Sequence, residues 1–106
     1  MQAKTISIIG LGRMGLSVGL ALRQSSLAVT VIGADEDAER RQTAQKTLGA
    51  VNQATADLVQ AAAQGDIVVL AVSADAQLAT LALVGSALKP HALLLDLGAL
   101  KGPSRR

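Results

Sequence analysis

Hydrophobic residues occur along this chain in short runs that alternate with longer segments of mixed polarity. Four runs have the length of a single strand: residues 5–10, 28–33, 67–72 and 92–97. The last two are almost continuously apolar, which is typical of strands covered on both faces, as in a parallel sheet. Residues 50–53 form a shorter run, which predicts a weak additional strand.

The segments between these runs carry the signals of helices. We expect four helices, over residues 13–24, 37–48, 56–64 and 76–88. Gly49 and Gly65 directly follow two of them and are suited to end them. Thr55 is the expected N-cap of the third helix, and Ser73 or Asp75 that of the fourth.

The first predicted helix has one apolar face, formed by Met14, Val18, Ala21 and Leu22 at helical spacing. Gly19 lies on the same helix, where the lack of a side chain would let the helix approach the sheet closely.

Alternating strands and helices of this kind predict an α/β fold. We expect an open, doubly wound (Rossmann) parallel sheet with helices on both faces, formed by residues 1–106 as a single domain. Right-handed crossovers give the strand order 3-2-1-4-5. The order reverses between the first strand and the strand at 67–72, so a ligand should lie at the carboxyl ends of these two strands.

Composition narrows the possible functions. The chain of 106 residues has no aromatic residue, so bases cannot stack on it as they do on many single-strand nucleic-acid binders. A net charge of +2 with scattered basic residues also disfavours a nucleic-acid partner. With no cysteine and one histidine, we expect no metal site. No apolar run approaches 18 residues and the first strand begins at once, so we expect a cytoplasmic protein without a membrane span.

The turn after the first strand reads Gly10-x-Gly12-x-x-Gly15 and opens the first helix. In a dinucleotide-binding turn, the first glycine permits the tight bend, the second lets the backbone reach a diphosphate, and the third allows helix and strand to pack closely. Backbone N–H groups at the start of the helix, together with the helix dipole, suit a diphosphate. Arg13 can add a charged contact or simply face the solvent.

Asp35 follows Gly15 by 20 residues, at the end of the second strand. There it can accept hydrogen bonds from the hydroxyls of an adenosine ribose, or alternatively cap the helix that follows. Glu36 and Asp37 would repel the additional phosphate of NADP, which Arg40 and Arg41 would only partly offset. The sequence therefore predicts NAD as cofactor, with NADP bound at least tenfold more weakly.

The predicted cofactor contacts come from the glycine-rich turn and the ends of the other strands. They are Gly10, Leu11, Gly12, Arg13, Met14, Gly15, Asp35, Val72, Ser73 and Gly98. Ser73 can contact the cofactor ribose or cap a helix. No catalytic residue is assigned, because neither His91 nor Asp66 is expected at the ligand edge. Asp96 is expected to be partly buried, and Lys101 to lie at the ligand edge.

The chain resembles the N-terminal nucleotide-binding domain of prephenate and arogenate dehydrogenases. The resemblance is carried by residues 9–17, 65–72 and 96–102, with residues 31–35 similar to the second strand of that family. It implies an NAD(P)-dependent oxidative decarboxylation on the route to tyrosine. Ala99 stands where the family usually has serine, and Ser73 where proline is common. The family's catalytic histidine and its helical C-terminal substrate and dimerisation domain lie beyond this sequence.

The turn at residues 10–15 is also similar to that of β-hydroxyacid and 6-phosphogluconate dehydrogenases. Two functions remain open: a cofactor domain that works with a substrate-domain partner chain, or a non-enzymatic NAD(H)-sensing module. We expect no turnover from the chain alone, and leave open whether it is part of an enzyme. The strand at 92–97 should form an apolar sheet edge, which predicts a homodimer through this strand and the 76–88 helix.

Overall fold

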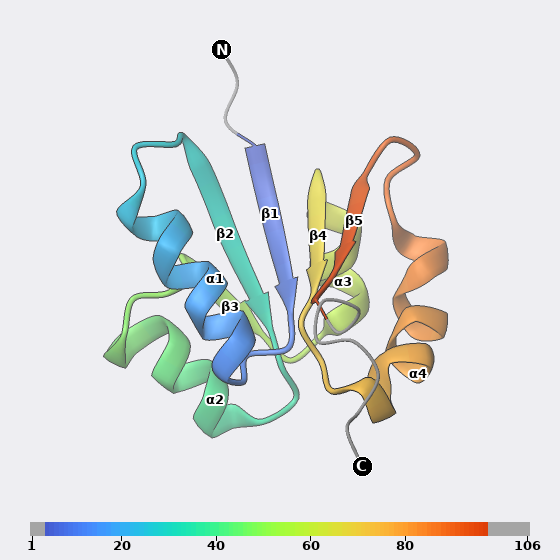
Figure 1. The fold of residues 1–106 in the computed structure, drawn as a ribbon, viewed down its shortest axis with the longest axis horizontal. Coiled ribbons are helices and arrows are strands. Elements are labelled where there is room, and N and C mark those ends of the chain that lie inside the picture. The colour runs from blue at the N-terminus through green and yellow to red at the C-terminus, as the bar shows by residue number, and fades with distance from the viewer. Residues whose placement is uncertain (1–3, 98–106) are drawn as a thin grey trace.

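The computed structural model describes residues 4–97 and contains one five-stranded sheet with helices on both faces (Figure 1). Its strands are β1 (Lys4–Ile9), β2 (Val29–Ala34), β3 (Gln53–Thr55), β4 (Ile67–Leu70) and β5 (Leu93–Asp96). They lie in the order β3-β2-β1-β4-β5, and every neighbouring pair is parallel. The predicted doubly wound fold and its strand order are confirmed.

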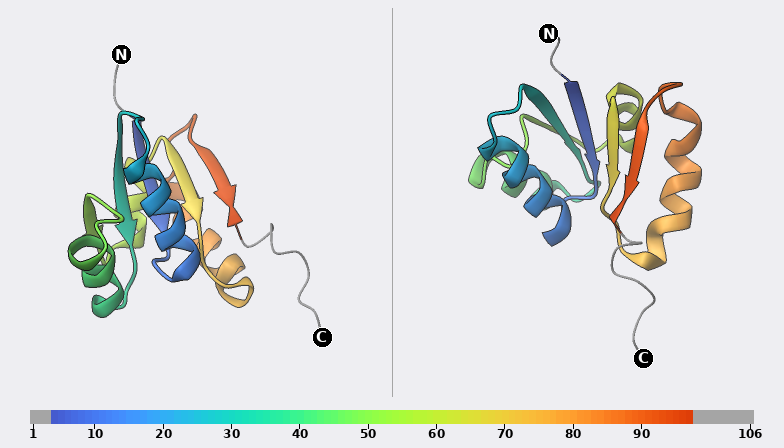
Figure 2. Two further views of the ribbon diagram at one scale, coloured as in Figure 1. Left: turned by 60° about the vertical axis from the view of Figure 1, so that its left-hand side comes forward. Right: turned by 45° about the horizontal axis from the view of Figure 1, so that its top comes forward.

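The helices are α1 (Arg13–Gln24), α2 (Ala38–Gln42), α3 (Leu58–Gln64) and α4 (Ala74–Val84). A π-helical turn, η1 (Thr43–Thr47), continues α2, and a 3-10 turn, η2 (Gly85–Ala87), continues α4. Helix α1 packs on one face of β1 and β2, whereas α3 packs on the other, next to α4 (Figure 2). All strands end at the same edge of the sheet, where α1 and α4 begin (Figure 1).

Each face of the sheet has its own aliphatic core. Ile8 and Val31 are buried in the cluster beneath α1, and Ile9 and Val68 in the cluster beneath α3 and α4. A buried polar side chain joins the sheet to α3: the Ser7 hydroxyl of β1 donates a hydrogen bond of 2.6 Å to the carbonyl of Ala61 in that helix. A buried hydroxyl with a partner avoids the desolvation cost of an unpaired one.

The predicted start of the weak strand and that of the third helix are wrong. The weak strand lies at Gln53–Thr55 rather than 50–53, since Ala50 and Val51 enter the core as a loop. Helix α3 begins at Leu58, and its N-cap is Asp57, whose Oδ1 accepts the N–H of Gln60 at 3.0 Å. Thr55 ends β3 instead. The position of the weak strand is decided by its pairing with β2, which a pattern of hydrophobic residues along the chain cannot show.

The predicted face of α1 is only partly right. Val18 and Leu22 pack against the core, but Ala21 is exposed, and the buried positions are the glycines Gly15 and Gly19. A Cβ at Gly19 would lie 2.5 Å from the carbonyl oxygen of Ala50, so the close approach is to this loop and not to the sheet. A pattern of hydrophobic side chains does not mark glycine, although the closest contacts of a helix are made where it has a glycine.

The other helix ends differ by a few residues from those expected. The segment predicted as one helix over 37–48 is α2 followed by η1, and Gly49, with a φ of +64°, comes just after it as expected. Helix α4 begins at Ala74 and has Ser73 at its N-cap position, although the Ser73 side chain makes no capping hydrogen bond.

Strand β5 is the last strand of the sheet among residues 4–97. Leu94 packs against the core beneath α3 and α4, but Leu93 and Leu95, on the opposite face, are 54% and 43% exposed. Helix α1 covers that face only over β1 and β2 (Figure 1). The described part of the chain therefore leaves an apolar strip along this edge.

Candidate functional site

A cavity of about 480 Å³ opens at the carboxyl ends of β1, β2 and β4. Its lining comes from the end of β1 and the glycine-rich turn, the end of β2, the segment after β4, the start of α3 and the first two turns of α4. The lining residues are Ile9, Gly10, Gly12, Arg13, Met14, Ala34, Asp35, Glu36, Arg40, Leu58, Ala71, Val72, Ser73, Ala76 and Thr80. The cavity thus lies at the predicted point of strand-order reversal.

The three glycines of the turn have different surroundings. Gly10 has a φ of +105°, and a Cβ there would lie 2.6 Å from the carbonyl oxygen of Ala71. A Cβ at Gly15 would lie 1.9 Å from the carbonyl oxygen of Gly10. Gly12 has room, since the nearest atom to a Cβ there is Nη1 of Arg40, at 3.8 Å. Packing therefore requires Gly10 and Gly15, whereas Gly12 leaves open space beside the cavity.

Helix α1 begins at this open position. Gly12 is its N-cap and provides no side-chain cap, and the first turn contains no acidic residue. The first N–H groups of a helix have no partner within the helix and lie at the positive end of its dipole. Beside the cavity, they provide donors and positive potential that suit an anion.

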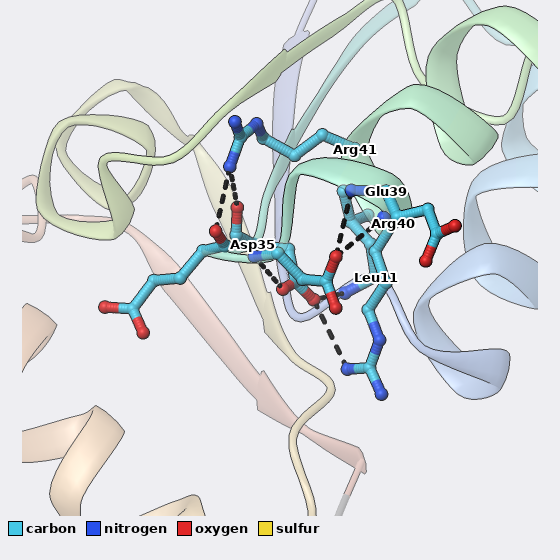
Figure 3. A network of polar contacts seen from close by, with 7 residues as sticks. Leu11, Asp35, Glu39, Arg40 and Arg41 are labelled. Atoms are coloured by element: carbon cyan, nitrogen blue, oxygen red, sulfur yellow. Dashed lines mark hydrogen bonds and ion pairs between the residues drawn. The ribbon is translucent and has the colours of Figure 1, made fainter.

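Asp35 is held at the end of β2 with 9% of its surface exposed. Its Oδ2 accepts the N–H of Leu11 at 2.8 Å, and its Oδ1 accepts the N–H of Asp37 at 2.9 Å (Figure 3). A carboxylate offers roughly four acceptor positions, so Asp35 can accept further hydrogen bonds from the cavity. The N-cap of α2 is Asp37, which accepts the N–H groups of Glu39 and Arg40, so the capping alternative for Asp35 is wrong.

Two neighbouring arginines reach Asp35 in different ways (Figure 3). Arg41 donates from Nη1 to the backbone carbonyls of Asp35 and Glu36, at 3.0 and 3.1 Å. Arg40 approaches the carboxylate instead, with Nη1 3.6 Å from Oδ2 of Asp35. Glu36 also lines the cavity, so one carboxylate and one guanidinium flank Asp35 there.

Most residues predicted to contact a cofactor meet at this cavity. Gly10, Gly12, Arg13, Met14, Asp35, Val72 and Ser73 line it. Leu11 is buried and contributes its N–H to Asp35, while Gly15 lies beneath the turn against Gly10. Gly98 lies outside the described residues, as does Lys101.

The sequence interpretation missed Leu58, Ala76 and Thr80 as lining residues. The topology contained a signal for them, because a parallel strand–helix–strand connection places the start of each helix near the carboxyl edge. Leu58 is the first residue of α3, and Ala76 and Thr80 lie one turn apart on one side of α4.

The opposite edge of the sheet has a smaller cavity, of about 370 Å³, lined in part by His91, Lys4, Asp66 and Lys89. His91 is exposed there, away from the ligand edge as predicted. Asp66 accepts the N–H of Thr5 at 2.8 Å, and Nζ of Lys89 at 3.0 Å. The hydrogen bond from Thr5, reinforced by Lys89, holds the pKa of Asp66 below its ordinary value.

Asp96 is half-buried, as predicted, and its Oδ2 accepts a hydrogen bond from Nε2 of Gln77, which ties β5 to α4. Within residues 4–97, no group of three histidine or acidic residues is arranged to hold a metal ion. No helix in that part of the chain is both long and apolar enough to span a membrane.

Comparisons with known structures agree with this fold. The prephenate dehydrogenase of Aquifex aeolicus is 23% identical, with a TM-score of 0.77, over 91% of this chain and 34% of that one. The Synechocystis arogenate dehydrogenase is 26% identical, with a TM-score of 0.74, over 87% of this chain and 32% of that one. The Mycobacterium tuberculosis 3-hydroxyisobutyrate dehydrogenase is 23% identical, with a TM-score of 0.70, over 90% of this chain and 31% of that one. The chain thus spans about a third of the length of these structures. A comparison with curated protein sequences finds no match.

The third of these structures, a 3-hydroxyisobutyrate dehydrogenase, corresponds to the alternative family of β-hydroxyacid dehydrogenases. The chain shares its fold with both kinds of enzyme, so the fold alone does not choose between the two families. The sequence does, because the family described as "Prephenate dehydrogenase, nucleotide-binding domain" matches residues 18–105. The chain therefore belongs to the family of prephenate dehydrogenase nucleotide-binding domains.

Proposed function

We propose that this nucleotide-binding domain binds NAD in the cavity at the carboxyl edge of the sheet, that is, the edge at which its parallel strands end. The observation that carries the proposal is the Asp35 carboxylate, fixed by the N–H of Leu11 beside the glycine-rich turn. It brings a ribose-binding acceptor and the N-terminus of α1 to one cavity. The Aquifex aeolicus prephenate dehydrogenase was solved in complex with hydroxyphenyl propionate and NAD+, which supports the same ligand class here.

The residues present fit the two polar parts of the adenosine half of the cofactor. The open space at Gly12 lets a diphosphate approach the first N–H groups of α1, and Arg13 adds positive charge at the same place. Asp35 accepts hydrogen bonds from the ribose hydroxyls. Val72 and Ser73 line the continuation of the cavity after β4, where Ser73 offers a hydroxyl to the second ribose. When bound, NAD supplies the hydride acceptor.

Charge favours NAD over NADP. The additional phosphate of NADP carries close to two negative charges near neutral pH, and it would lie beside Asp35 and Glu36. Titration calorimetry of the purified chain with each cofactor tests this preference. We expect NADP to bind at least about tenfold more weakly than NAD, and equal affinities would contradict the role given to Asp35.

We propose that the chain serves as the cofactor half of an oxidative decarboxylation of prephenate or arogenate, and that it needs a substrate domain to react. The cavity holds the residues to orient a dinucleotide, but within residues 4–97 His91, the single histidine of the chain, lies at the opposite edge. NADH formation by the pure protein with prephenate as substrate would contradict this view.

We also propose that a second copy of the chain covers the apolar strip on β5. Leu93 and Leu95 are exposed beside an edge strand, and edge strands pair readily with an identical strand related by a two-fold axis. Light scattering at high micromolar concentration should show a dimer, which Leu95→Glu converts to a monomer. Leu27→Glu is the control, because Leu27 is 62% exposed and precedes β2, which β1 and β4 separate from β5. A wild-type monomer would contradict the proposal.

A further inference from the structure

We propose that Arg40 sets how strongly this site discriminates against a phosphorylated adenosine ribose. This inference rests on the proposed binding of NAD, and it goes further by assigning the balance between the two cofactors to one side chain. Removing the Arg40 guanidinium weakens NADP binding and leaves NAD binding largely unchanged. The neighbouring Arg41, of identical chemistry, does not have this role.

The two arginines are separated by what their guanidinium groups contact. Arg41 is committed to the main chain, since its Nη1 donates to the carbonyls of Asp35 and Glu36. Its charge holds the loop after β2 in place. Arg40 has a side chain that is 58% exposed, and it lies 3.6 Å from the carboxylate of Asp35, beyond hydrogen-bond distance. Only the carboxylate of this pair is buried, and the exposed guanidinium makes no hydrogen bond to it, so Arg40 can turn to another partner at small cost.

The position of Arg40 connects both polar parts of the cavity. Its Nη1 is 3.6 Å from Oδ2 of Asp35 and 3.8 Å from the point that a Cβ on Gly12 would occupy. The guanidinium is therefore close to both the proposed ribose-binding carboxylate, as Figure 3 shows, and the N-cap position of α1. A phosphate on the adenosine ribose would enter this space.

The acidic side chains and Arg40 have opposite effects on NADP binding. Asp35 and Glu36 repel a ribose phosphate, and Arg40 provides the opposite charge beside them. A guanidinium can bind phosphate with two parallel N–H donors, which makes arginine well suited to this contact. An unphosphorylated ribose offers hydroxyls to Asp35 and gains little from Arg40, which competes with it for the same carboxylate. Arg40 thus acts as a counter-charge that moderates the rejection of NADP.

The experiment compares NAD and NADP binding to the wild-type chain, Arg40→Gln and Arg23→Gln under identical salt conditions. Arg23→Gln is a matched control, because it removes the same charge from the last turn of α1, away from the cavity. We expect Arg40→Gln to raise the ratio of the NADP to the NAD dissociation constant by about tenfold, with NAD affinity changed less than about twofold. Arg23→Gln should leave the ratio unchanged. Where NADP binds too weakly to titrate directly, displacement of bound NADH by NADP gives the same ratio.

Three results are distinguishable. An unchanged ratio in Arg40→Gln overturns the assignment, and so does an equal loss of NAD and NADP affinity, which would place Arg40 on a part that both cofactors share. Failure of the wild-type chain to bind either cofactor refutes the proposed function itself. Salt provides a second readout, because NADP binding should lose part of its salt dependence in Arg40→Gln and NAD binding should not.

Discussion

The two edges of the sheet carry the same kind of ion pair in different surroundings. At the carboxyl edge, Asp35 lies beside Arg40, and its side chain is 11% exposed. At the amino edge, Asp66 lies beside Lys89, and its side chain is 33% exposed. Both carboxylates accept a backbone N–H next to β1: Asp66 accepts that of Thr5 near the start of the strand, and Asp35 that of Leu11 in the turn after it.

The difference between the edges comes from the direction of the chain. Parallel strands place the beginnings of the helices, with their unpaired N–H groups, at the carboxyl edge. There an aspartate is positioned beside groups that attract an anionic ligand. At the amino edge, an equivalent aspartate meets the ends of helices and serves to join segments of the fold. The type of residue does not decide its role; the edge of the sheet does.

Substitution of the glycines should give the largest effect and should separate folding from binding within the carboxyl edge. Gly15→Ala places a Cβ 1.9 Å from the carbonyl oxygen of Gly10, so we expect it to destabilise the fold by about 3 kcal/mol or more. Gly12→Ala meets no atom closer than 3.8 Å and should change stability by less than about 1 kcal/mol. Thermal unfolding of both variants measures this contrast.

Gly12→Ala should nevertheless weaken NAD binding at least about tenfold, because its methyl group occupies the space through which a diphosphate approaches the backbone. A folded Gly12→Ala variant with unchanged NAD affinity would show that the diphosphate does not bind at this turn.

The comparison of the edges is tested directly by Asp35→Asn and Asp66→Asn. Asp35→Asn should weaken NAD binding by about tenfold or more, since an amide donates where the carboxylate accepts from the ribose. Asp66→Asn should leave NAD affinity unchanged and lower the melting temperature. Calorimetric titration and thermal unfolding of the two variants supply both readouts. Equal effects of the two substitutions on NAD binding would remove the distinction between the edges.

The smallest effect concerns acid stability at the amino edge. The pKa of Asp66 is lowered in the folded chain from an ordinary value of 3.8, so its contribution to stability is present above that pH. The contribution is lost as the pH falls through the folded-state pKa. The difference in melting temperature between the wild type and Asp66→Asn should therefore be constant above about pH 5 and shrink below pH 4. A difference that grows in acid would contradict this account.

Much of the fold could be predicted from the sequence, because β1, β2 and β4 are buried on both faces and therefore give clear apolar runs. Strand β5 gives a similar run although Leu93 and Leu95 are exposed on one face. The strand order followed from right-handed connections alone. What could not be predicted depends on contacts between distant segments. The short strand β3 is placed by pairing with β2, and the approach of Gly19 to Ala50 involves two residues with little hydrophobic signal.

For the candidate site, the glycine-rich turn and Asp35 were found because their spacing is set by one strand–helix–strand unit. The different contacts of Arg40 and Arg41 were not, since adjacent arginines on a helix look alike in sequence and point in different directions. The residues of α3 and α4 that line the cavity also required the helices to be placed on the sheet.

The central claim is that the carboxyl edge binds NAD through the turn at Gly12 and the carboxylate of Asp35. Calorimetric titration of the wild-type chain with NAD and then NADP tests it most directly. The account predicts saturable binding of one NAD per chain, with NADP at least about tenfold weaker. Absence of binding for both cofactors, in a chain that thermal unfolding shows to be folded, would contradict it.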